Sequence, residues 1–120
     1  MPPETVDRSK RRSRLTDRFS AWGIDGLLLS DAANIRYLTG FPGTDAAAIL
    51  MRDRVVLLVD GRYTTEARET VRDAEIVEVR DWVEGVAGVL AASTERRIGF
   101  ESDCVTVHAH ERLLSALGPD

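Results

Sequence analysis

The chain has 120 residues, a formal net charge of −4 and one cysteine, Cys104, and its length fits a single domain with one core. Residues 1–18 carry six basic and three acidic side chains, which leaves ten basic against seventeen acidic in the remainder and argues against nucleic-acid binding. A lone cysteine forms no intrachain disulfide and no Cys-based zinc site, and no signal-peptide run is present, so we expect a cytoplasmic protein. No stretch approaches the ~18 apolar residues of a spanning helix, so no membrane partner is expected.

A helix is expected over residues 5–22. Residues 1–4 contain two prolines and should be disordered. Leu15, Phe19 and Trp22 fall at i, i+4 and i+7, so the second half of this helix should pack on the core before Gly23 ends it. A targeting or nucleic-acid tag is the disfavoured interpretation of its basic cluster, because a solvated helix face explains it. The residues expected to stay in water are Arg8, Lys10, Arg11, Arg12 and Arg14.

A buried strand is expected over residues 24–30, followed by a polar stretch that ends at a glycine. Asp31 can cap one helical turn, with Asn34 three residues later, and Gly40 permits a reversal. The competing interpretation is structural, with Asn34 in a tight turn and a tyrosine packed on the core. In the functional interpretation, three side chains lie where a strand gives way to a loop, the usual place for binding groups: Asn34, Arg36 and Tyr37.

Two nearly continuous apolar runs, residues 46–51 and 54–59, are separated by Arg52 and Asp53, which is a hairpin signature. Because both runs lack polar alternation, both faces of the sheet should be covered by helices.

A glycine marks the junction between the third strand and a helix expected over residues 63–72. Asp60 and Arg62 flank Gly61 closely enough to pair, or to bond neighbouring backbone, and so hold the loop. A phosphate-binding loop is disfavoured, because neither GxGxxG nor a GxxxxGK pattern is present. The buried side of the helix should carry Tyr63, Ala67 and Val71.

The remaining pattern predicts a strand over residues 75–80, a helix over 82–92, a strand over 97–101 and a last helix beginning at Thr106. This order of elements indicates an α/β sandwich around a mixed sheet.

Three segments resemble, in order and spacing, the N-terminal domain shared by Xaa-Pro aminopeptidases, Xaa-Pro dipeptidases (prolidases) and creatinases: residues 25–29, 34–41 and 57–64. The resemblance covers nearly the whole chain. It implies a three-layer sandwich similar to ribonuclease H, with a mixed five-stranded sheet in the order 3-2-1-4-5 and the second strand antiparallel to its neighbours. It also implies that residues 1–120 form one accessory domain, because the family's chemistry sits in a C-terminal pita-bread catalytic domain, a metallopeptidase unit that this chain lacks.

No hydrolytic site is expected in this chain alone. On a helix, His108 and His110 would point about 200° apart and could not share a metal, and Cys104 is interpreted as a structural thiol. The resemblance places the metal ligands in the absent catalytic domain, where a parent hydrolase would hold two divalent ions, Mn, Co or Zn. We therefore expect no catalytic residue and no metal ligand among these 120 residues.

A binding and positioning role is what the resemblance implies for this domain. It would hold a homodimer together and wall the active site of the partner subunit. The substrate-facing part is expected at Phe41 and the loop over residues 42–45, although Pro42 departs from the Ser or Thr that the family often has there. The family's motif positions fall on Asn34, Arg36, Tyr37, Gly40 and Phe41, and on Asp60, Gly61, Arg62 and Tyr63.

Two other functions stay open at the level of sequence. One is a free-standing ligand- or protein-binding module that kept the fold. The other is the same domain attached to a creatinase-type amidinohydrolase. The sequence does not choose between an aminopeptidase and a dipeptidase.

Overall fold

The computed structural model describes residues 8–42, 46–71, 74–92, 97–100 and 111–113. The expectations for residues 1–4, for residues 43–45 of the loop expected to face the substrate, and for Cys104, Thr106, His108 and His110 lie outside these ranges. No helix within the described ranges is long and apolar enough to cross a membrane. The elements are α1 (Arg8–Thr16), α2 (Phe19–Trp22), β1 (Gly26–Leu29), α3 (Ala32–Thr39), β2 (Ala46–Met51), β3 (Val55–Asp60), the 3₁₀ turn η1 (Gly61–Tyr63), α4 (Thr64–Thr70), β4 (Glu75–Val79), α5 (Trp82–Ala91) and β5 (Ile98–Phe100).

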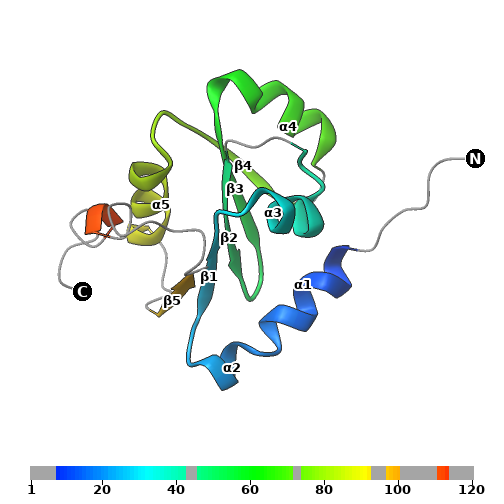
Figure 1. Ribbon diagram of the computed structural model, residues 1–120, viewed down its shortest axis with the longest axis vertical. Coiled ribbons are helices and arrows are strands. Elements are labelled where there is room, and N and C mark those ends of the chain that lie inside the picture. Colours follow the sequence, from blue (N-terminus) through cyan, green and yellow to red (C-terminus); the bar gives the residue numbers. More distant parts are fainter. Residues whose placement is uncertain (1–7, 43–45, 72–73, 93–96, 101–110, 114–120) are drawn as a thin grey trace, which may run out of the picture.

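In the described part of the chain, five strands form one mixed sheet in the order β4-β3-β2-β1-β5 (Figure 1). β2 is antiparallel to β1 and β3, whereas the outer pairs β3–β4 and β1–β5 are parallel. The expected hairpin closes at its polar tip, where the Met51 N–H donates to the Arg54 carbonyl at 2.8 Å. The α/β class, the mixed sheet and the central run 3-2-1 are confirmed.

The strand beside β1 is β5, whereas the expected order 3-2-1-4-5 places the fourth strand there. β4 pairs with β3 instead, because the chain leaves β3 through η1 and α4, and strands joined by a helical crossover of this length commonly pair as neighbours. Leu57 lies opposite Ile76 and Leu58 opposite Val77, so this pairing joins apolar stretches and extends the core.

Helices cover both faces of the sheet, as expected, with α5 on one face and α1, α3 and α4 on the other (Figure 1). Neighbouring strand residues point to opposite faces, so Leu28 packs with the α5 side and Leu29 with the α3 and α4 side. Covering both faces explains why the strands have continuous apolar sequences.

The N-terminal helix is divided in two, where one helix was expected. At the join, the Arg18 N–H donates to the Leu15 carbonyl at 3.0 Å, an i−3 bond that tightens the last turn of α1. After the break Phe19 is in the core with 0% exposure, but Trp22 no longer shares an apolar face with Leu15 and Phe19. Trp22 is 48% exposed, so its expected packing is wrong, whereas Gly23 ends α2 as expected with φ 69°.

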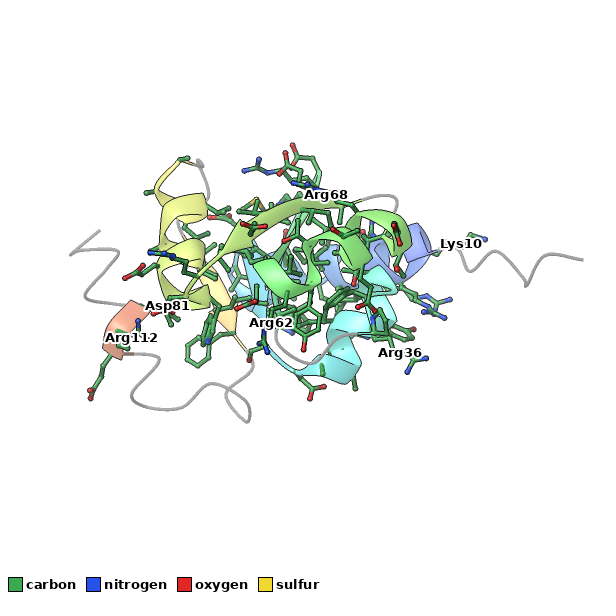
Figure 2. The ribbon with its side chains drawn as sticks, turned by 90° about the horizontal axis from the view of Figure 1, so that it is seen from above. Lys10, Arg36, Arg62, Arg68, Asp81 and Arg112 are labelled. Carbon is green, nitrogen blue, oxygen red and sulfur yellow. The ribbon has the colours of Figure 1, made fainter. Side chains whose placement is uncertain are left out.

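α5 lies close to the sheet because Gly85 has no side chain. A Cβ at this position would lie 2.9 Å from Cδ2 of Leu58 and closer still to Val79. The start of α5 is held by Asp81, whose carboxylate accepts a backbone N–H of the helix and forms an ion pair with Arg112 (Figure 2). The backbone N–H and the guanidinium together keep this end of the helix in place.

Candidate functional site

The first sequence motif forms α3, which has 8 residues where a single turn was expected. Asp31 caps it by accepting the Asn34 N–H at 3.2 Å, and Gly40 ends it with φ 83° and an N–H that donates to the Arg36 carbonyl at 2.8 Å. Both expected roles are confirmed. The Arg36 side chain points away from the sheet (Figure 2), and Tyr37 is 48% exposed, so Tyr37 does not pack on the core.

A buried threonine turns the chain inward after α3. The Thr39 hydroxyl donates to the Ile35 carbonyl at 2.7 Å and accepts the Phe41 N–H at 3.2 Å. Phe41 therefore enters the core with 0% exposure. Phe41 was expected to face a substrate, but its side chain packs inside the core. The adjacent Pro42 is exposed.

Two arginines of α1 reach the last turn of α3. Nη1 of Arg11 donates to the Tyr37 carbonyl at 2.7 Å, and Nε of Arg12 donates to the Leu38 carbonyl at 3.1 Å. Carbonyls at a helix C-terminus lack intrahelical partners and carry partial negative charge, so the two guanidinium groups stabilise this end. The expectation that both arginines stay in water is wrong, although Lys10 on the same helix is exposed as expected.

The second sequence motif follows the end of β3. Oδ1 of Asp60 accepts the backbone N–H of Arg62 at 2.9 Å and its side-chain Nε at 3.0 Å, which confirms the predicted pairing. The backbone N–H, and then the side chain of Arg62, hold the pKa of Asp60 below its ordinary value. The Arg62 guanidinium also lies 5.2 Å from the centroid of the Tyr63 ring.

The two motifs meet through their aromatic rings. The centroids of Phe41 and Tyr63 are 6.2 Å apart, and their planes are inclined by 79°, which is an edge-to-face contact. The chain neighbours of these two rings are exposed: Pro42 follows Phe41, and Arg62, whose side chain is 69% exposed, precedes Tyr63. The structure thus joins the two motifs through a contact between the buried Phe41 and the half-buried Tyr63.

Thr39, Thr64 and Glu78 support the motifs and were missed in the sequence. The Thr64 hydroxyl donates to Oε1 of Glu78 at 2.7 Å and ties the start of α4 to β4. That carboxylate also lies beside Gly61, where a Cβ would be in ordinary van der Waals contact with the carboxyl carbon of Glu78 at 3.4 Å. The role of Thr39 could have been predicted, because a threonine beside the glycine that ends a helix is a recognisable pattern. No local pattern indicates the role of Glu78, which lies on another strand.

A slot of about 320 Å³ opens between α1 and α3, over β1. Asn34 and Tyr37 line it, whereas Asp60, Arg62 and Tyr63 do not. Most of the predicted site residues therefore divide into two groups, one at this slot and one at the contact between the two motifs, whereas Arg36 is exposed and does not line the slot.

Neither group has the composition of a hydrolytic centre. Among the described residues, no three His, Cys, Asp or Glu side chains are close enough together to hold a metal ion. The described residues therefore do not fit a two-metal centre. The hydrogen bonds from Arg62 and the low pKa of Asp60 also make this carboxylate a poor general base. Within its described part, the chain is an α/β domain built on one mixed five-stranded sheet.

Residues 11–120 match the Creatinase/Prolidase N-terminal domain family, and the chain belongs to this family. The N-terminal domain of the cytoplasmic peptidase PepQ from Mycobacterium tuberculosis H37Rv has a similar structure, with a TM-score of 0.85 and 36% identity over 90% of this chain and 85% of that one. An Xaa-Pro aminopeptidase from Streptococcus pyogenes is also similar, with a TM-score of 0.84 and 31% identity over 92% of this chain and 85% of that one.

A curated relative, the uncharacterized peptidase YqhT of Bacillus subtilis (strain 168), is 33% identical over 94 residues, which are 78% of this chain. The chain spans 27% of the length of that relative.

Proposed function

We propose that this domain is the non-catalytic N-terminal domain of a cytoplasmic, metal-dependent Xaa-Pro peptidase, either an aminopeptidase or a dipeptidase. The observation that carries the proposal is the family match over residues 11–120, together with 31% identity to an Xaa-Pro aminopeptidase of similar structure. In the parent enzyme a C-terminal pita-bread domain would supply the catalytic residues and two divalent ions, Mn, Co or Zn.

The domain's own role, in this proposal, is to help hold a homodimer together and to wall the active site of the partner subunit. Pro42 and Arg62 are suited to such a wall, because both are exposed and each is next in the chain to one ring of the contact between Phe41 and Tyr63. A rigid surface narrows a neighbouring site without contributing to the chemistry.

Kinetics of the parent enzyme test whether Arg62 belongs to this wall. Arg62→Ala should raise the kcat/KM for longer Xaa-Pro peptides relative to that for shorter ones. The reason is that removing the guanidinium group leaves more room at the active site that it narrows. Arg68→Ala is the matched control, since Arg68 is an exposed arginine on α4 away from the motif contact (Figure 2). Equal ratios for the wild type and both variants would exclude Arg62 from the wall.

Mixed dimers test which subunit supplies the wall of a given active site. A subunit that keeps its catalytic domain but carries Arg62→Ala is paired with a catalytically inactive subunit whose N-terminal domain is wild type. Restored length selectivity supports action across the dimer. A parent enzyme that is fully active as a monomer by light scattering would contradict it.

The reading frame after codon 120 separates the remaining functions. A frame with spaced Asp, Asp, His, Glu and Glu ligands supports the peptidase or a creatinase-type amidinohydrolase, and assays with Xaa-Pro peptides and with creatine distinguish these two. A natural stop would overturn the proposal in favour of a free-standing binding module.

A further inference from the structure

The slot between α1 and α3 has walls of matching pattern. α1 contributes Arg11, Arg14 and Leu15, and α3 contributes Asn34, Tyr37 and Leu38, so each helix presents residues i, i+3 and i+4 to the slot. Side chains at these spacings share one face of a helix. Each wall therefore carries one leucine and two polar side chains.

The apolar part of the slot lies deeper than the polar part. Leu29 and Leu38 are buried, and Leu15 and Leu27 are half-buried. Because Leu27 and Leu29 are alternate residues of β1, both point to the same face of the sheet. Arg14, Asn34 and Tyr37 are exposed and form the rim.

One side of the rim is held in place before any ligand arrives. The Arg11 guanidinium lies 4.1 Å from the centroid of the Tyr37 ring, and its Nη1 donates to the Tyr37 carbonyl. The stacking and the hydrogen bond restrict both side chains, so ordering them on binding costs less entropy. Arg14, one turn further along α1, brings a second positive charge to the same rim.

We infer that this slot binds a small carboxylate with an apolar body. The leucines would take the aliphatic or aromatic body, and the rim of two guanidinium groups, one amide and one phenol would hold the anionic end. Guanidinium groups suit a carboxylate because they offer parallel N–H donors to its two oxygens. The inference does not depend on the proposed peptidase function.

The size of the slot limits the ligand. A volume of about 320 Å³ is near the lower end of the roughly 300–1,000 Å³ of small-molecule sites. A single aromatic ring or a branched chain of similar size fits this volume, whereas a folded peptide does not. We therefore name 3-phenylpropionate as the probe.

Titration of the ¹⁵N-labelled 120-residue chain with 3-phenylpropionate tests the inference by NMR. We expect saturable shifts of the amides of Leu27, Leu29 and Asn34. The neutral analogue 3-phenylpropanamide should bind about tenfold more weakly, because it cannot form charge-assisted hydrogen bonds. Acetate, which lacks the apolar body, should give no saturable shift.

Substitutions at one position separate the charge of the rim from the fold. Arg14→Gln should weaken binding of 3-phenylpropionate by about fivefold to tenfold, and Arg14→Glu should abolish it, because the second guanidinium is lost or replaced by a like charge. Lys10→Gln is the matched control, since Lys10 is an exposed cation of the same helix that does not line the slot (Figure 2).

Three results would overturn the inference. Equal affinity for the acid and the amide would remove the role of the carboxylate. Equal effects of Arg14→Gln and Lys10→Gln would show attraction by net charge alone. Shifts confined to β4 and α5 would place the ligand elsewhere.

Discussion

At the scale of single residues, Arg12 connects two helices that are far apart in the chain. Its Nε donates to the Leu38 carbonyl at 3.1 Å across a separation of 26 residues. Arg12→Ala should therefore lower the free energy of unfolding by about 1 kcal/mol, because a carbonyl at a helix C-terminus loses a charged partner.

Urea denaturation of the purified chain measures this difference. Lys10→Ala is the control, since Lys10 is exposed on the same helix, and its effect should stay within about 0.5 kcal/mol. Equal effects of the two substitutions would mean that the bond from Arg12 contributes nothing to stability.

Asp60 makes stability depend on pH at the acid end. Its pKa is lowered in the folded protein, first by the backbone N–H of Arg62 and then by the Arg62 side chain. A carboxyl group with a depressed folded pKa stabilises the protein above its unfolded value, about 3.8, and loses that contribution as pH falls through the lower folded value. Asp60→Asn should therefore be less stable than wild type at pH 7, and its stability should fall less between pH 4 and pH 2.

Urea midpoints across this pH range check the prediction for Asp60. Arg62→Gln serves as a graded comparison, because it removes the side-chain bond but keeps the backbone N–H, and it should retain part of the acid dependence. Parallel curves for wild type and Asp60→Asn would contradict the prediction.

At the scale of elements, α5 contains two glycines with opposite surroundings. A Cβ at Gly85 would lie 2.9 Å from Leu58 Cδ2, whereas a Cβ at Gly88 would meet nothing within 4 Å. Gly85→Ala should destabilise the chain by about 1–3 kcal/mol through overpacking. Gly88→Ala should stabilise it by about 0.4–1 kcal/mol, because alanine reduces the freedom of the unfolded chain.

Thermal unfolding of the two alanine variants measures the contrast. Each variant is the control for the other, since both change glycine to alanine in the same helix. Changes of the same sign would show that α5 does not approach the sheet at Gly85.

At the scale of the whole molecule, the chain on its own should not hydrolyse Xaa-Pro peptides, with or without added Mn, Co or Zn. The described residues contain no group of three His, Cys, Asp or Glu that could hold a metal ion. A chromogenic Xaa-Pro assay on the purified chain checks this. Metal-dependent turnover that disappears when His108 or His110 is substituted would contradict it.

Several ends of helices and loops follow from interactions over a few residues, so they could be predicted from the sequence alone. Asp31 accepts an N–H three residues away, Asp60 pairs with a residue two away, and Gly23 and Gly40 take positive φ where helices end. Continuous apolar runs also determined that both faces of the sheet are covered, because a strand buried on both sides needs no polar alternation.

Which elements lie side by side depends on packing across the whole sheet. An apolar run specifies that a strand is buried but not which strand lies beside it, so the place of β4 next to β3 emerged only in the assembled sheet. Phe41 is likewise an aromatic residue in a loop sequence, and the Thr39 hydroxyl together with the Tyr63 ring decides that it points inward. At the slot between α1 and α3, Arg11 and Arg12 reach carbonyls 26 residues away, a contact that no local pattern encodes.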